Sequence, residues 1–351
     1  MTFPDSPLDS PLNTAIGAFD AAVAAQDTQA TDQAFSAVMQ QLPNMTRDQA
    51  VAAGPQLAAL LADIPSWPRA SLAVAVGACV ERGADAAVCA EPLLASLQIA
   101  LEAASVFAER WTSSGGGDTP NLAEEPSIEE LTARIGPADE PATREAVTAW
   151  WTLEQWERAA VAVLSDARVR SGAGRHPGLL HLIDVIEPVY GDMAPLSRAL
   201  LVLDDEPLLV LHRPTRAGFR LRMTGVADNF QLHTLLGGVL VGGGRIPGEP
   251  PSAQAVAVST DTAFSAEARP MTEGNFNLVA PGGDWIWNEG TPRDIPVVDG
   301  VRLLVLDPPP YRRTWQAGRF FPRMTASLEL EGVLGPAEAE RWFERVAEPK
   351  R

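Results

Sequence analysis

The apolar residues change their spacing partway along this sequence, and that change restricts the folds open to the chain. In the first half they recur every three or four positions, as in Ile16, Phe19 and Val23, which is the spacing of one buried helix face. In the second half they alternate or run together, as in Phe219 and Leu221, which is typical of strands. The sequence therefore predicts an α+β protein, with an Ala-rich helical part before a mixed α/β part that has a largely antiparallel sheet.

Breaks in these patterns divide the chain into four predicted segments. Residues 1–12 are rich in Pro, Ser and Asp and are expected to be a disordered arm, whereas residues 13–112 are expected to form four or five antiparallel helices. Residues 113–143 combine a Gly-rich run with prolines and carboxylates, which predicts a flexible acidic linker. Residues 144–351 are assigned to an α+β domain, whose first, tryptophan-rich helix is expected to pack on the rest of that domain.

Short apolar runs predict the strands of the C-terminal part. Residues 199–203 and 208–211 are expected to form a hairpin, and a half-buried strand with Arg220 and Arg222 on its outer face should follow. Asp228 is expected to cap the next helix. Further strands are predicted at residues 255–258, 275–279, 284–287 and 301–306, and a final amphipathic helix at residues 338–347.

The charge of the chain limits its partners. It holds 45 acidic and 27 basic side chains, a net charge of −18 at pH 7, which disfavours nucleic acid and anionic membranes as partners. The excess lies in residues 1–165, which hold 22 acidic and 7 basic side chains. This asymmetry predicts that the helical part meets a basic protein surface.

The ends and the cysteines bear on location. The N-terminus lacks the basic and apolar regions of a signal peptide, and no apolar run reaches about 18 residues, so we expect a cytoplasmic protein. Cys79 and Cys89 lie in apolar helical sequence and are expected to be reduced. Lys350 is the only lysine, and abundant Arg and Ala are typical of a bacterial, GC-rich genome. The presence of Arg and not Lys at a given position is therefore weak evidence that its side-chain geometry was selected.

Motifs of fixed spacing for catalysis, metal or cofactor binding do not occur, so no cofactor and no metal are predicted. His176 and His181, with Asp184 and Glu187 after them, lack the spacing of metal ligands. The glycine-rich residues 237–244 lack the Lys and Ser/Thr of a phosphate-binding loop. They are expected to end a helix and turn the chain, with a phosphate cradle as the alternative.

One helix start carries residues suited to acid–base chemistry. Asp228 and His233 stand five positions apart with two amides between them. A helix N-terminus favours anions, and His exchanges protons near neutrality. The candidate catalytic residues of a cofactor-independent enzyme are therefore His233, Asp228 and Arg222, assisted by Arg220. The alternative is that Asp228 only caps the helix and His233 is a buried helix residue.

Aromatic and arginine residues gather in two other segments. Trp285 and Trp287 share one face if they lie on a strand, and they precede Asn288 and Glu289. Three prolines stiffen residues 308–310, before a stretch expected to be exposed and rich in the residue types of binding hot spots. The candidate binding residues are Tyr311, Arg312, Arg313, Trp315, Trp285 and Trp287, with Arg319 close in sequence.

These residues have bland alternatives as well. Both tryptophans of residues 285–287 would pack on the C-terminal helix, and residues 307–315 would be only a rigid surface loop. On balance the sequence favours a non-catalytic binding or regulatory protein that contacts a protein or peptide, over the cofactor-independent enzyme. It leaves open whether the protein is catalytic.

Overall fold

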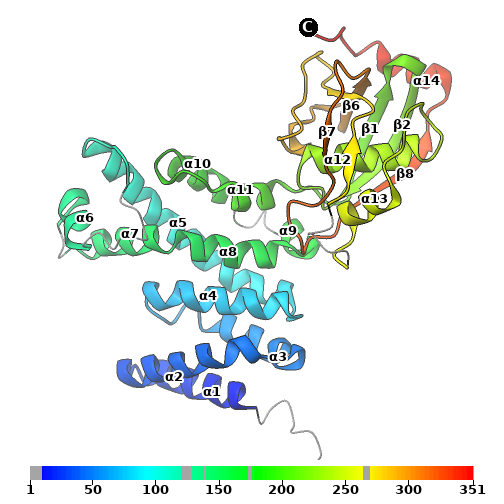
Figure 1. The fold of residues 1–351 in the computed structure, drawn as a ribbon. Helices are drawn as coiled ribbons and strands as arrows, with labels where there is room; N and C mark the ends of the chain where they lie inside the picture. Colours follow the sequence, from blue (N-terminus) through cyan, green and yellow to red (C-terminus); the bar gives the residue numbers. More distant parts are fainter. Residues whose placement is uncertain are drawn as a thin grey trace, which may run out of the picture. The chain divides into compact units, whose positions relative to one another are not determined.

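The computed structural model describes residues 10–119, 128–137, 140–172, 176, 178–263 and 269–350. Its contacts divide the chain into two compact units, Met1–Leu200 and Leu201–Arg351. The first unit is helical, and the described strands all lie in the second (Figure 1). The predicted α+β class, with helices before a largely antiparallel sheet, is confirmed.

The first unit is built from helices that bury their apolar sides against one another. Thr46 and Gln49 form a capping box at the start of α3 (Arg47–Ala59), in which the Gln49 N–H donates to the Thr46 hydroxyl at 3.3 Å and the Thr46 N–H donates to Gln49 Oε1 at 2.8 Å. The helices are α1 (Pro11–Ala24), α2 (Thr28–Gln41), α3 (Arg47–Ala59), α4 (Ser66–Glu81), α5 (Ala86–Ser113), α6 (Ile128–Ile135), α7 (Pro141–Trp151), α8 (Leu153–Leu164), α9 (Ala167–Gly172), α10 (Leu179–Tyr190) and α11 (Ala194–Leu201).

Helix α5 contacts most of the other helices of this unit, among them α3, α4, α7, α8 and α10. It begins at Ala86, after its N-cap Asp85, so Pro92 lies inside the helix and not in its first turn. By length and composition alone α5 would suit a membrane span. Half of its most apolar stretch is buried inside the protein. Packing against neighbouring helices accounts for the buried half of this apolar surface.

The tryptophan-rich helix packs on the first unit, which differs from the predicted domain boundary at residue 144. Residues 144–165 form two helices, α7 and α8, which contact α4 and α5. Trp150 stacks on Phe107 with ring centroids 4.4 Å apart. Three tryptophans in a short stretch predict burial but do not specify the surface that buries them.

The predicted arm and the predicted linker lie partly outside the described residues. Residues 1–9 of the predicted arm, and residues 120–127 and 138–139 of the predicted linker, lie outside the described residues. Pro11 already belongs to α1, which Ser10 caps by accepting from the Asn13 N–H at 3.2 Å.

The second unit is organised by a six-stranded sheet. Its strand order is β4-β6-β1-β2-β8, with β5 also paired to β6, and only the β1–β6 pair is parallel. A separate two-stranded sheet joins β3 to β7. The strands are β1 (Glu206–His212), β2 (Ala217–Thr224), β3 (Met271–Glu273), β4 (Asn277–Val279), β5 (Val297–Val298), β6 (Val301–Asp307), β7 (Thr314–Gln316) and β8 (Ser327–Val333).

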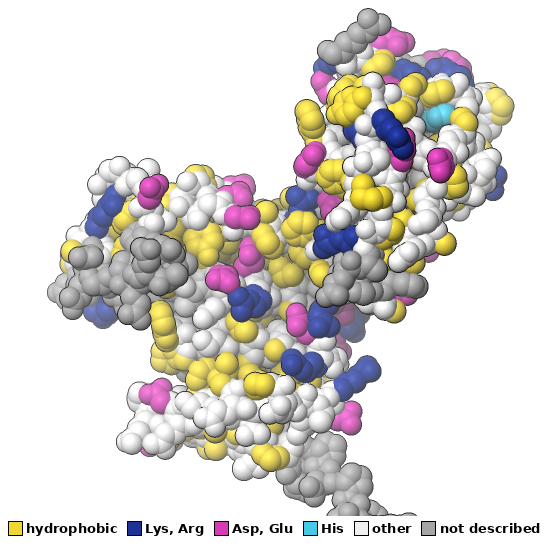
Figure 2. All heavy atoms as spheres, viewed as in Figure 1, with side chains coloured by type: hydrophobic (Ala, Val, Ile, Leu, Met, Phe, Trp, Pro, Cys, Tyr) yellow, Lys and Arg dark blue, Asp and Glu magenta, His cyan; other side chains and the backbone are white. Residues whose placement is uncertain are grey.

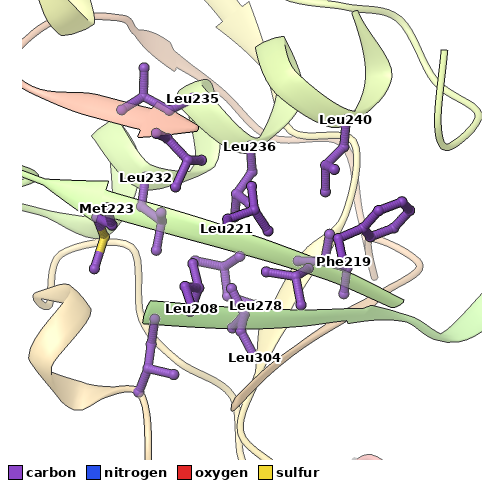
Figure 3. Close-up of a cluster of buried hydrophobic side chains, with 14 of the residues drawn as sticks. Leu208, Phe219, Leu221, Met223, Leu232, Leu235, Leu236, Leu240, Leu278 and Leu304 are labelled. Atoms are coloured by element: carbon purple, nitrogen blue, oxygen red, sulfur yellow. The ribbon is translucent and has the colours of Figure 1, made fainter. Parts of the chain in front are cut away.

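Helices cover both faces of the larger sheet. On one face, α12 (Asn229–Leu236) packs Leu232 and Leu236 against Leu221 of β2, as Figure 3 shows, and α13 (Ala253–Thr260) packs beside α12. On the other face, α14 (Pro336–Phe343) buries Phe343 against Leu211 and neighbouring side chains. Alternate residues of a strand face opposite sides of the sheet, so the helices on the two faces pack against different residues of the same strands.

Some predicted strands are wrong. Residues 199–201 end α11, and β1 pairs instead with β2. Residues 255–258 lie in α13, which Ser252 caps by accepting from the Ala255 N–H at 3.1 Å. A short apolar run fits a helix or a buried strand equally well, so its pattern alone does not decide between them.

Other predictions held in part. The strands expected at residues 219–223 and 301–306 lie within β2 and β6, and residues 277–279 of the run 275–279 form β4. Residues 284–287 contribute only an isolated bridge between Val279 and Trp285. The C-terminal helix ends at Phe343. Strand β8 was not predicted, although its Leu328 and Leu330 alternate with glutamates and Gly335 and Pro336 follow it.

Candidate functional site

A pocket of about 440 Å³ opens on the second unit, and we call it the aromatic pocket. All six predicted binding residues line it: Trp285, Trp287, Tyr311, Arg312, Arg313 and Trp315. The rest of the lining is Phe230, Asn277, Ile286, Asn288, Glu289 and Thr314. The structure thus brings together two segments that sequence reasoning treated separately.

Backbone hydrogen bonds fix the loop that carries Trp285 and Trp287. The Ile286 N–H donates to the Leu278 carbonyl at 2.9 Å, which ties the loop to β4. The start of α12 holds its other end, because the Phe230 N–H donates to the Asn288 carbonyl at 3.1 Å. The Asn229 side chain also donates to the Trp287 carbonyl, at 2.9 Å. The Phe230 N–H is one of the groups that a helix start leaves without an intrahelical partner.

The second segment follows β6. Asp307, the last residue of β6, is buried and accepts from Arg213 Nε at 2.6 Å. Residues 308–310 are the three prolines, and β7 begins at Thr314. A charge pair at the strand end and a proline-stiffened connection together restrict where residues 311–313 lie.

Three large aromatic side chains stand exposed at this pocket. Trp287 has 69% relative exposure, Tyr311 has 58% and Trp285 has 36%. Figure 2 shows hydrophobic side chains at the surface of the second unit, between basic and acidic ones. Burial on the C-terminal helix, the alternative for the two tryptophans, does not occur for Trp287.

Trp315 is half-buried, which corrects the expectation that it is exposed. Its ring lies 5.6 Å from that of Phe230, and its Nε1 donates to the Thr234 hydroxyl at 3.2 Å. Both contacts are to α12, so Trp315 joins β7 to that helix. Its aromatic surface contributes to the pocket lining from a fixed position.

The two arginines of the pocket differ in their partners. Arg312 forms an ion pair with Glu273, with Nη2 2.8 Å from the carboxylate. Arg313 Nη2 donates to the Phe276 carbonyl at 3.1 Å and to Asn277 Oδ1 at 3.0 Å. Among the described residues no carboxylate pairs with Arg313, so its positive charge is not neutralised there.

His233 lies buried behind this lining, with 1% relative exposure. Its ring stacks on Phe276, and neither ring nitrogen makes a hydrogen bond of normal geometry within the described part of the chain. Burial lowers the pKa of His233 to about 3, and the charge of Arg313 adds to this effect, while the nearby Asn288 side chain opposes it. The imidazole is therefore neutral near pH 7, which does not suit a general acid and base.

The other proposed catalytic residues lie apart from His233. Asp228 accepts from the Gln231 N–H at 2.7 Å and so caps α12. Arg220 pairs with Glu338 of α14, and Arg222 pairs with Asp205 at 3.1 Å. Because Leu221 faces α12, the alternation of β2 turns Arg220 and Arg222 to the opposite face of the sheet. The predicted catalytic set is not brought together.

A second pocket of about 430 Å³, which we call the adjacent pocket, shares Phe230 and Trp315 with the first. Arg319, one of its lining residues, is buried and donates to the carbonyls of Val258 at 2.7 Å and Pro322 at 3.1 Å, and also to that of Asp261. Its remaining lining residues are Asp228, Gln231, Arg269, Gln316, Gly318 and Phe320.

The weaker sequence features acquire structural roles. No cluster of three His, Cys, Asp or Glu suited to a metal was found in the described residues. His176 Nε2 lies 4.0 Å from Glu91, and His181 is on α10. Gly237–Val241 form a π-helical turn after α12, where a Cβ on Gly238 would come within 2.9 Å of Val256. That glycine allows close helix packing.

Comparisons with protein-family models, with curated proteins and with solved structures found no match to this chain. Sequence reasoning had named Asp228, Trp315 and Arg319 of the adjacent pocket but had not predicted that pocket, and it missed Asn277 and Thr314. Only the pairing of β3 with β7 and of β4 with β6 places these residues, and neither pairing leaves a local signal.

Proposed function

We propose that this protein is a non-catalytic binding protein whose second unit captures a peptide segment of a partner protein in the aromatic pocket. The observation that carries the proposal is the exposure of Trp285, Trp287 and Tyr311 around one cavity. Large aromatic side chains are usually buried, and an exposed cluster of them is typical of an interaction site.

The fixed position of the lining supports the same proposal. Hydrogen bonds from α12 and β4 hold the loop of residues 285–289, and prolines restrict residues 311–313. A site that is already ordered loses less conformational entropy when it binds. Aromatic residues and arginine are also the residue types that dominate binding energies at protein interfaces.

Polar groups in the lining suit a peptide backbone. Asn277 and Asn288 are buried, with 3% and 6% relative exposure, and place carboxamides in the wall of the pocket. A few fixed polar groups in a mostly aromatic pocket orient a ligand and discriminate between ligands. Carboxamides can both donate to and accept from the amides of a bound chain.

The first unit supports a second contact, with a basic surface. Residues 1–200 hold 26 acidic and 11 basic side chains, a net charge of −15. A pocket of about 560 Å³ between α1, α2 and the turn after α3 is lined by Asp20, Asp32 and Asp63 and by no Lys or Arg. Opposite charge accelerates association and discriminates between partners.

The proposal is tested by selecting peptides on the full-length protein from a displayed library of random dodecapeptides. The selected peptide is then titrated into protein labelled with ¹⁵N, and the indole N–H signals of the tryptophans are followed. We expect the signals of Trp285, Trp287 and Trp315 to shift and those of the first unit to stay in place. Absence of any selected peptide, or binding without shifts of these three signals, would contradict the proposal.

A further inference from the structure

Strand β7 has an unpaired edge. Among the described residues it pairs only with β3, with Trp315 opposite Thr272. The Gly274 N–H donates to the Arg313 carbonyl at 2.9 Å, and the Ala317 N–H donates to the Pro270 carbonyl at 2.8 Å. Hydrogen-bonded pairs alternate along an antiparallel ladder, so Arg313, Trp315 and Ala317 direct their backbone groups at β3.

The residues between them face the other way. By the same alternation, the N–H and C=O groups of Thr314 and Gln316 point away from β3. Both residues are exposed, and no hydrogen bond within the described ranges uses these backbone groups. An exposed edge of this kind is a template for pairing with another extended chain.

The two pockets lie along that edge. Residues 311–315 line the aromatic pocket, Trp315, Gln316 and residues 318–320 line the adjacent pocket, and no residue of β3 lines either one. Trp315 and Phe230 form the wall that the pockets share. An added strand would therefore pass Trp315 with a pocket on each side of it.

The charge of the lining indicates the chemistry of the occupant. The two linings hold four arginines, Arg269, Arg312, Arg313 and Arg319, against the carboxylates of Asp228 and Glu289. Arg312 pairs with Glu273 and lies in the field of Glu249, and Arg319 lies in the field of Asp261, whereas Arg313 pairs with no carboxylate of the described residues. On a chain of net charge −18, the unneutralised charge of Arg313 in the pocket lining favours an acidic partner segment.

We propose that an extended, acidic segment of a partner protein adds to the free edge of β7 as a third strand of the β3–β7 sheet. Its backbone pairs with Thr314 and Gln316, and its side chains enter the two pockets beside Trp315. In strand addition the main-chain hydrogen bonds supply affinity, and pockets for alternate side chains supply specificity. This inference rests on the proposed function, because it specifies the ligand of the same site.

A pair of variants isolates the main-chain contact. Gln316→Pro removes the outward N–H, whereas Gln316→Ala removes only the side chain and keeps that N–H. Proline is tolerated on the open side of an edge strand, so the fold should persist, which thermal unfolding checks. With the peptide selected from the random library, we expect the proline variant to bind about tenfold more weakly than the alanine variant, because the two differ in the outward N–H.

A second measurement uses the unaltered protein, so it decides the question even if Gln316→Pro does not fold. The selected peptide is synthesised with N-methyl groups at one alternate set of its amides and then at the other set. Strand addition predicts that one set abolishes binding and the other is tolerated, and that selected peptides are rich in Asp and Glu.

Three results would overturn the inference and leave the proposed function intact. They are equal binding to the Gln316→Pro and Gln316→Ala variants, equal loss with both N-methyl sets, and selection of Lys- and Arg-rich peptides. Each of these results is compatible with peptide binding that still depends on Trp287, as the proposed function requires. A peptide that binds independently of Trp287 would instead contradict the proposed function itself.

Discussion

The imidazole of His233 lies flat against the ring of Phe276, with ring centroids 4.3 Å apart and planes inclined by 7°. Trp315 meets the same imidazole nearly edge-on, with centroids 4.8 Å apart. His233 therefore joins the aromatic lining to the core beside α12. The His233 side chain, which the sequence suggested as an acid–base residue, is packed behind the lining of the aromatic pocket.

This packing predicts how stability depends on pH. The pKa of His233 falls from 6.5 to about 3 on folding, so below pH 6.5 the unfolded chain binds a proton that the folded chain does not. The folded state therefore keeps its full stability above about pH 6.5 and loses stability as the pH falls towards 3. By linkage, His233 lowers the free energy of unfolding by about 2 kcal/mol near pH 5.

His233→Phe keeps an aromatic ring on Phe276 and removes this proton linkage. Its melting temperature should therefore fall less than that of the wild type between neutral pH and about pH 5. His212, whose pKa burial also lowers, contributes equally to both proteins. Exposed His181→Phe is the matched control and should keep the wild-type dependence. Equal pH profiles for His233→Phe and the wild type would show that His233 is accessible to protons in the folded state.

Trp315 should matter for stability as well as for binding. Trp315→Ala removes the contacts with His233 and Phe230 and the hydrogen bond to Thr234, so the free energy of unfolding should fall by about 2 kcal/mol. Trp287→Ala, at an exposed position, should change it by less than about 0.5 kcal/mol. Urea unfolding measures both, and equal values for the two variants would contradict the half-buried position of Trp315.

The cysteines provide an independent check on the first unit. Cys79 and Cys89 are free and fully buried, and burial raises their pKa values to about 12 and about 11. The thiolate, which is the reactive form, is then scarce at pH 8, at about one part in a thousand or less. Labelling with a disulfide reagent should be slow in native protein and fast in urea. Rapid reaction of both thiols without denaturant would mean that this core opens readily.

The six residues that the sequence marked as binding candidates line one pocket, whereas the packing of several elements was predicted wrongly. Prolines before Tyr311 and the tryptophans of residues 285–287 are local features, and such features mark a segment whatever it packs against. The prediction of a strand at residues 255–258 was wrong, because an apolar run of this length fits a helix as well as a strand.

Long-range contacts explain what sequence reasoning could not reach. The pocket exists because the Phe230 N–H bonds to the Asn288 carbonyl and because β4 pairs with β6. The separation of Arg222 from His233 follows from the face of β2 that α12 covers. Neither relationship is encoded in neighbouring residues, whereas the helix cap at Asp228 is, and that cap was predicted.

The most direct test of the account is calorimetric titration of the selected peptide into wild type, Trp287→Ala and Trp67→Ala. Trp67, with 57% relative exposure, is a comparably exposed tryptophan in the first unit and serves as the matched control. If the aromatic pocket is the binding site, Trp287→Ala weakens peptide binding about tenfold or more and Trp67→Ala changes it by less than about twofold. Unchanged affinity for Trp287→Ala, in a variant that melts like the wild type, would contradict the aromatic pocket as the binding site.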